Sequence, residues 1–178
     1  MASTQAFLPP LRRVVTAHND QGVAVVESDA MLPSEPMTIV KNARDVPLWV
    51  TTEMPSKDNN SREDGRLRVI DDLTNFGLVP SSGTNLRSTE LGPGAITPMH
   101  RTSSVDFNIL VTGEIVLITE DGKETHLSNA GDTVVQKGGM HAWRNPSSDK
   151  WARWVTVLIA AEPAVVNGSV LKPAFVHD

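Results

Sequence analysis

The sequence contains no cysteine among its 178 residues. This excludes disulfides, thiolate metal ligands and a cysteine nucleophile, and it is compatible with a reducing compartment. The sequence also lacks a basic run, since the formal net charge is −5 and the basic groups at 12–15 and 65–69 are short. Such groups cannot follow a phosphate backbone, so we expect no nucleic-acid partner.

Long apolar runs are missing as well. No stretch approaches the ~20 residues that a membrane-spanning helix needs. The N-terminal residues, MASTQAFLPPLRR, lack the basic start and apolar run of a signal peptide. We therefore expect a cytoplasmic protein that has no membrane partner.

What the sequence does contain is a series of short strand patterns. A length of 178 residues suits one domain, and we treat 1–178 as a single unit. No segment keeps a 3.6-residue apolar period, so helices should be few and short. Hairpin turns are predicted at Asn19–Gly22 and at Asp121-Gly122. The pattern predicts an all-β sandwich or closed barrel.

Other segments carry more local expectations. We expect a strand at each end of 38–50, and strand patterns recur at short intervals from residue 67 onward. The stretch 52–65 is the most polar part of the chain, which predicts an exposed and disordered loop. Strands are also expected in 152–162 and 132–136.

Two histidine stretches raise the question of chemistry. In 94–113, His100 and Thr102 are two residues apart and share a face of a regular strand, and Asp106 shares it if the strand continues. In 131–145, His141 follows a Gly138-Gly139 turn. Two imidazoles and one carboxylate that converge inside a barrel are a sufficient ligand set for Fe(II), Mn(II), Ni(II) or Zn(II).

These two stretches resemble the paired signature of the cupin superfamily. The residues that fit the first motif at its usual spacing are Gly94, His100, Asp106 and Gly113. The residues that fit the second, with one residue fewer after the first glycine, are Gly131, Gly138, His141 and Asn145. The wider text from 12 to 162 resembles small single-domain cupins of fungal natural-product gene clusters, some of which are labelled oxidoreductases. The resemblance implies a jelly-roll β-barrel at 12–162, with a C-terminal extension at 163–178.

The sequence departs from the family pattern at the metal site. Cupin sites commonly use three histidines and a glutamate, but here Thr102 replaces one histidine and Asp106 replaces the glutamate. Threonine is a poor ligand for a divalent transition metal. The remaining set, His100, Asp106 and His141, either holds a metal (Fe, Mn, Ni or Zn) or serves as metal-free acid–base residues. Gln136 replaces the proline of the second motif, which we expect to affect only a turn.

Neighbouring residues suggest contacts to a substrate. Thr102 faces inward with His100 and offers a hydroxyl, and Trp143 lies two residues after His141, so it shares the same face and either walls a pocket or packs in the core. Arg101 should face outward. Trp151 and Trp154 are expected in the core or at a dimer contact.

The most direct function is a small enzyme acting on a carbonyl-bearing small molecule, of polyketide type by the resemblance. The reaction would be proton abstraction next to the carbonyl, followed by loss of water or isomerisation. His100 or His141 would be the base, oriented by Asp106 if no metal is bound. The alternatives are an Fe(II)-dependent oxidoreductase and a cupin that binds a ligand without chemistry. The resemblance also implies a homodimer, with an N-terminal strand such as 23–28 as the exchanged edge.

Overall fold

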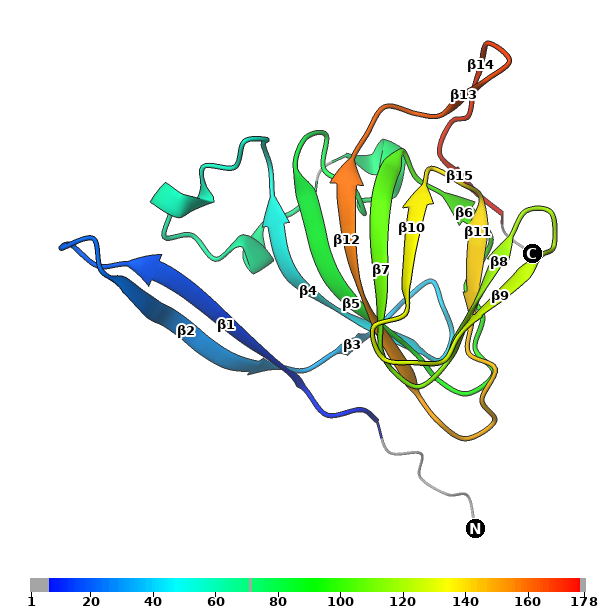
Figure 1. The fold of residues 1–178 in the computed structure, drawn as a ribbon, viewed down its shortest axis with the longest axis horizontal. Helices are drawn as coiled ribbons and strands as arrows, with labels where there is room; N and C mark the ends of the chain where they lie inside the picture. The colour runs from blue at the N-terminus through cyan, green and yellow to red at the C-terminus, as the bar shows by residue number, and fades with distance from the viewer. Residues whose placement is uncertain (1–6, 71, 177–178) are drawn as a thin grey trace.

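A computed structural model describes residues 7–70 and 72–176. Within them the chain forms two facing β-sheets of a jelly roll (Figure 1). The larger sheet has the order β10-β7-β12-β5-β4-β3, and the smaller sheet has the order β15-β6-β11-β8-β9. Helical structure in the described residues is limited to the short 3-10 turns Asp58–Asn60, Gly65–Leu67 and Leu73–Asn75. The predicted all-β cupin-type fold with few short helices is confirmed.

The strands of the larger sheet are β3 (Glu35–Pro36), β4 (Ala43–Thr51), β5 (Thr84–Leu91), β7 (Ser104–Thr112), β10 (Thr133–Lys137) and β12 (Ala152–Ala160). Those of the smaller sheet are β6 (His100–Arg101), β8 (Ile115–Thr119), β9 (Glu124–Leu127), β11 (His141–Arg144) and β15 (Ala174–Phe175). Both predicted hairpins are confirmed. The strands expected at the start of 38–50 and directly after residue 67 do not form. Residues 38–42 turn into β4, and residues 68–70 follow a 3-10 turn.

The hydrophobic core fills one half of the barrel. In the large sheet, Leu91 of β5 pairs with Ala43 of β4 and with Ala152 of β12, and all three belong to the buried core cluster. Trp154 pairs with Leu110 one step further along the same sheet. The opposite ends of β5 and β7 carry buried polar side chains instead, among them Asn85, Asp106 and Asn108, so the other half of the barrel is left for a site.

The chain crosses between the two sheets twice at this polar end. Between β6 and β7 it crosses at residues 102–103, and between β10 and β11 it crosses at residues 138–140. Gly138 has a φ of 59°, a left-handed conformation that favours glycine. A Cβ on Gly138 would lie 3.6 Å from the carbonyl oxygen of Thr102, so the two crossings are neighbours. The residues of the two histidine motifs therefore lie close together because these two connections between the sheets are neighbours.

The other motif residues have structural roles. Gly113 has a φ of 78°, and a Cβ there would lie 2.7 Å from Cα of Ala152, so no larger residue fits. Asn145 is fully buried and its side-chain amide donates to the carbonyls of Leu91 and Lys150. These contacts fix the connection into β12 and hold the closed end of the barrel.

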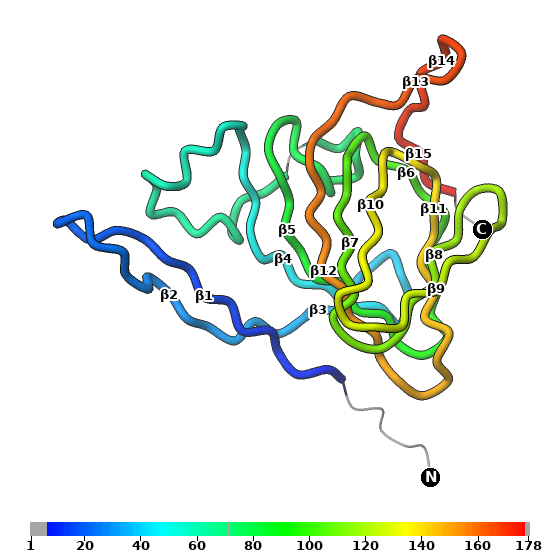
Figure 2. The backbone as a smooth tube through the Cα atoms, in the orientation of Figure 1, coloured from blue at the N-terminus to red at the C-terminus, as the bar shows by residue number. Residues whose placement is uncertain are grey.

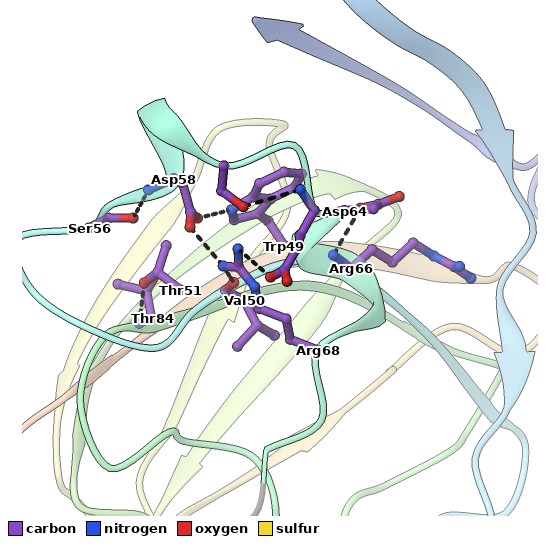
Figure 3. Close-up of polar contacts among 11 residues, drawn as sticks. Trp49, Val50, Thr51, Ser56, Asp58, Asp64, Arg66, Arg68 and Thr84 are labelled. Carbon is purple, nitrogen blue, oxygen red and sulfur yellow. Dashed lines mark hydrogen bonds and ion pairs between the residues drawn. The ribbon is translucent and has the colours of Figure 1, made fainter.

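The polar segment 52–65 is ordered by contacts with the barrel, which corrects the predicted disorder. Asp58 accepts hydrogen bonds from the Trp49 indole at 2.7 Å and from Arg68 at 2.8 Å (Figure 3). Arg68 also donates to the carbonyl of Val50. Asp64 caps the second 3-10 turn through the amide of Arg66. Because these partners are distant in sequence, composition alone predicts the wrong state.

The hairpin of β1 (Leu11–His18) and β2 (Ala24–Leu32) forms a sheet of its own that extends beside the barrel (Figures 1 and 2). Arg13 ties it to the 52–68 segment through a two-pronged ion pair with Asp64, with both distances at 2.6 Å. At the C-terminal end, the hairpin of β13 (Val165–Val166) and β14 (Ser169–Val170) leads to β15, which pairs with β6. The predicted C-terminal extension thus completes the smaller sheet. No helix in the described residues is long and apolar enough to cross a membrane.

Candidate functional site

A cavity of about 100 Å³ lies between the two sheets at the polar end of the barrel. All five sequence-predicted site residues line it: His100, Thr102, Asp106, His141 and Trp143. Its walls are otherwise mixed, with aliphatic and aromatic side chains beside a few polar groups. A small, enclosed and largely apolar cavity with convergent polar groups is the usual form of a small-molecule site.

The two histidines sit side by side on the smaller sheet. His100 of β6 and His141 of β11 are direct partners across the ladder, and their ring centroids are 4.2 Å apart. Nδ1 of His100 lies 2.9 Å from the carbonyl oxygen of Pro98. A carbonyl only accepts, so Nδ1 carries the hydrogen and Nε2 of His100 keeps its lone pair. Burial lowers the pKa of His100, so the ring is neutral at pH 7.

Gln136 of β10 (Thr133–Lys137) holds the second imidazole. Nδ1 of His141 donates to the carbonyl of Gly139 at 3.0 Å, and the side-chain nitrogen of Gln136 lies 3.2 Å from Nε2 of His141 and against Nδ1 as well. Burial, followed by the neighbouring charge of His100, lowers the pKa of His141 to about 3. His141 is therefore a neutral ring held between the Gly139 carbonyl and the Gln136 amide, which lies against its Nδ1 side.

Asp106 reaches the cavity from the other sheet. The strand that starts at His100 ends at Arg101, so Asp106 belongs to β7 and faces the histidines across the cavity. This corrects the expectation that one continuous strand carries both residues. Burial raises the pKa of Asp106 to about 6, although a hydrogen bond from Ser104 partly offsets the rise. Its Oδ1 is buried without a hydrogen-bond partner.

Asp106 does not orient either histidine, as the metal-free hypothesis expected. The backbone carbonyls of Pro98 and Gly139 do so instead. Backbone atoms carry no sequence signal, so this arrangement could not be read from the motif. It leaves Asp106 free to act on a bound molecule from the opposite wall.

The residues present do not form a complete metal site. In metal centres, an imidazole that donates Nδ1–H to a carbonyl presents Nε2 to the metal, and His100 fits that pattern. His141 likewise donates Nδ1–H to the carbonyl of Gly139, but the amide of Gln136 packs against its ring. Within residues 7–70 and 72–176, no three histidine, aspartate or glutamate side chains lie close enough to hold an ion together. The predicted set of His100, Asp106 and His141 is brought to one cavity but not to one coordination sphere.

The predicted substrate contacts are on the cavity wall. The hydroxyl of Thr102 is 2.8 Å from that of Ser104, which in turn hydrogen-bonds Asp106. Trp143 lines the cavity with its ring centroid 5.7 Å from that of Trp154. Trp154, expected only in the core or at a dimer contact, therefore serves both the core and the cavity, whereas Trp151 is buried away from it.

Sequence reasoning missed several residues at the site. Gln136, whose replacement of the family proline was expected to affect only a turn, lies in β10 directly opposite Asp106 and against His141. Asn108 shares the inward face of β7 with Asp106, as their two-residue spacing already indicates. Arg87 and Phe175 also line the cavity, and Phe175 pairs with His100 across the β15–β6 ladder. No local sequence pattern identifies Arg87 or Phe175, because the register between strands places them at the cavity.

A jelly-roll barrel whose two motif histidines meet in one interior cavity defines a cupin. No family model matches the chain, but curated proteins do. The chain is 32% identical to the "Oryzines biosynthesis cluster protein J" of Aspergillus oryzae over 166 residues, which span 92% of this chain and 90% of that protein. It is 30% identical to the "Cupin-domain-containing oxidoreductase virC" of Hypocrea virens, over 89% of this chain and 82% of that protein. The chain belongs to this family of cupin-domain proteins.

Solved structures agree on the fold. The polyketide cyclase RemF from Streptomyces resistomycificus superposes with a TM-score of 0.51 at 11% identity, over 82% of this chain and 80% of that one. The cupin domain of Schizosaccharomyces pombe Cnp3 gives a TM-score of 0.51 at 10% identity, over 84% and 87% of the two chains. At such identities the likeness concerns the fold alone.

Proposed function

We propose that this chain is an enzyme that moves a proton next to a carbonyl group of a small secondary-metabolite intermediate, with loss of water or isomerisation as the outcome. The observation that carries the proposal is the placement of His100 and Asp106 on opposite walls of one cavity. Burial lowers the pKa of the first and raises the pKa of the second, so inside the cavity each group favours its neutral form. Paired groups of this kind divide the base and acid roles.

In the dehydration, His100 Nε2 takes the proton from the carbon next to the carbonyl, and the electron pair of that C–H bond forms the enolate. Asp106, in its protonated form, gives its proton to the hydroxyl on the next carbon. The C–O bond breaks, the enolate pair forms the new double bond, and water leaves. Transfer of the proton from His100 to Asp106 restores the starting state. In an isomerisation, the proton taken by His100 is returned at another carbon.

The remaining residues position and shield these two groups. His141 stays neutral and packs beside His100, which keeps a second positive charge away from the base. Trp143 and Trp154 supply apolar wall, which excludes water and strengthens interactions with the charge that develops. We propose a polyketide-type substrate because relatives are named for fungal biosynthesis clusters.

The test is hydrogen exchange in deuterium oxide under nitrogen, followed by NMR with a panel of aliphatic and aryl β-hydroxy ketones. We expect the wild type to exchange the proton next to the carbonyl and to release water. His100→Gln and Asp106→Asn should each lose about 10²–10⁴-fold in rate. His126→Gln, which alters an exposed histidine of β9, is the matched control and should change nothing. No exchange with any member of the panel, or an unaffected His100→Gln, would contradict the proposal.

A second candidate is an iron-dependent oxidoreductase, because relatives such as virC are named as oxidoreductases. The incomplete set of metal ligands among the described residues argues against this candidate. Oxygen uptake after anaerobic reconstitution with Fe(II) separates the two candidates, because the proton-transfer reaction consumes no oxygen. A cupin that only binds would take up members of the panel without any turnover.

We also propose that the chain is a homodimer that associates through the β1–β2 hairpin. Exposed apolar side chains gather on this hairpin: Val14, Val23, Val25, Val26 and Met31. Exposed apolar side chains gathered on one element in this way are typical of a protein contact.

A further inference from the structure

A second polar row crosses the inner face of the large sheet, and the proposed proton transfer does not use it. Arg87 of β5, Thr156 of β12 and Asn108 of β7 lie directly opposite one another in register. All three line the cavity. Neighbouring strands are about 5 Å apart, so the row is a short, fixed line of polar groups.

Some polar atoms of this row have no hydrogen-bond partner within the protein. Asn108 Oδ1 accepts from the Thr156 hydroxyl at 2.8 Å, which fixes the amide so that Nδ2 points away from Thr156. That Nδ2 is buried and has no partner. Arg87 pairs with Asp45 through Nη2, while its Nε is buried and has no partner. A buried donor without a partner is unfavourable, so a ligand that brings an acceptor to these two atoms gains a hydrogen bond to each.

The next row of the same sheet instead has an acceptor that lacks a donor. Asp106 lies two residues before Asn108 on β7, and its Oδ1 is a buried acceptor without a partner. One row of this wall therefore has donors without acceptors, and the next row has an acceptor without a donor. Aliphatic and aromatic groups, including Ile39 and Trp154, surround both. The cavity fits a molecule with an apolar body and an oxygen-rich, anionic head.

We propose that Arg87 and Asn108 form an anchoring subsite for an anionic oxygen group, a carboxylate or an acidic enol, of the ligand. The guanidinium and the amide offer two donors to that head. A head anchored there holds the adjoining carbon beside Asp106, on the side that faces His100. That this ligand is the substrate rests on the proposed function. The anchoring itself depends only on the cavity.

The experiment measures binding, not turnover, with benzoate, benzamide and benzylamine as probes. Trp143 and Trp154 line the cavity, so tryptophan fluorescence reports occupancy. We expect the wild type to bind benzoate at least about tenfold more tightly than benzamide, and benzylamine not to compete. Equal affinities for benzoate and benzamide would overturn the proposal without any variant.

Two variants test the residues separately. Asn108→Asp keeps the oxygen that accepts from Thr156 and turns the unpaired donor into an acceptor, so benzoate affinity should fall at least about tenfold. Arg87→Gln should have a similar effect. Arg144→Gln is the matched control, because Arg144 pairs with Glu124 and does not line the cavity. Unchanged benzoate affinity in Asn108→Asp or in a folded Arg87→Gln overturns the subsite.

One further variant separates this proposal from the proposed function. His100→Gln should bind benzoate as the wild type does, because His100 is not part of the anchoring subsite. Benzoate binding with no His100-dependent turnover would leave the subsite standing and remove the proposed chemistry. If turnover depends on His100 but benzoate binds no better than benzamide, the proposed chemistry stands and the anchoring subsite is ruled out.

Discussion

His100 and Asp106 face each other across one cavity from two different sheets. His100 is in β6 of the smaller sheet and Asp106 is in β7 of the larger one. Only two residues, Thr102 and Ser103, separate these strands, and within them the chain passes from one wall to the other. A short crossing therefore places an imidazole and a carboxyl group that are six positions apart in sequence on opposite sides of the cavity.

The first prediction concerns the pH dependence of turnover. The active form needs a neutral His100 and a protonated Asp106, so it carries one proton between the two groups. Burial lowers the His100 pKa below 6.5 and raises that of Asp106 to about 6. We expect kcat/KM to pass through a maximum on the acid side of pH 7. Above the Asp106 pKa it should fall about tenfold per pH unit.

The measurement is initial rates between about pH 4.5 and 8.5, in buffers of constant ionic strength. Asp106→Asn removes the group that causes the alkaline fall, so any residual activity of this variant should be flat above pH 7. A wild-type rate that continues to rise towards alkaline pH would contradict the assignment of Asp106 as the acid.

The second prediction is that Asp106→Asn stabilises the fold while it removes activity. The folded-state pKa of Asp106 lies above its ordinary value, so ionisation costs more in the folded state than in the unfolded one. The cost is absent below about pH 4, grows as the pH rises towards 6 and is complete above it. At pH 7.5 we expect the variant to gain about 1–3 kcal/mol in free energy of unfolding.

Urea unfolding of both proteins at pH 4 and pH 7.5 checks this. The two curves should nearly coincide at the lower pH and separate at the higher pH. Thr156→Ser, a cavity-wall variant without an ionisable group, should show no such pH-dependent difference from the wild type. A gain that is the same at both pH values would mean that Asp106 ionisation is not its cause.

Much of this architecture follows from the sequence, because local rules determine it. Gly113 and Gly138 need conformations that glycine favours, and the Asp121-Gly122 pair gives the expected hairpin. The pair of histidine motifs predicts that His100 and His141 meet, and they are direct partners across the β6–β11 ladder. Turn chemistry and motif spacing are local properties, so a single sequence carries them.

The remainder depends on contacts between distant parts of the chain. The segment 52–68 looks disordered by composition, yet Arg13, Trp49 and Arg68 hold it in place. Gln136 replaces a family proline and was expected to affect only a turn, but sheet register puts it opposite Asp106 and against His141. Register and sheet crossings are set by tertiary packing, so the donor set around the histidines could not be predicted.

The third prediction tests the proposed homodimer. Lysine at Val14 and Val26, both exposed on the β1–β2 hairpin, places charge on the apolar surface of that hairpin. We expect the wild type to elute at twice the chain mass of 19.3 kDa in light scattering coupled to size exclusion. Val14→Lys/Val26→Lys should elute as a monomer. Val170→Lys changes an equally exposed valine on β14 and should stay dimeric. A dimeric double variant would place the contact elsewhere.

The fourth prediction is that Gln136 decides whether this cavity takes up a metal. His100 presents a free Nε2 beside the His141 ring, but the Gln136 amide packs against that ring, and no third ligand is in reach within residues 7–70 and 72–176. Gln136→Glu replaces the amide with a carboxylate at the same position, next to the His141 imidazole. Two histidines and a carboxylate suffice for Zn(II) or Fe(II). We therefore expect this variant to bind Zn(II) at least about tenfold more tightly than the wild type.

Titration with Zn(II), followed by elemental mass spectrometry after gel filtration, gives the affinity and the stoichiometry. Gln136→Leu is the matched control, because it removes the amide without adding a ligand and should bind no better than the wild type. His141→Ala in the Gln136→Glu background should lose the gain, since it removes one of the three donors. Near-stoichiometric metal in the untreated wild type, lost in His141→Ala alone, would show instead that Gln136 moves aside. That result would favour the oxidoreductase candidate, because the imidazole pair would then be a ligand pair in the native enzyme.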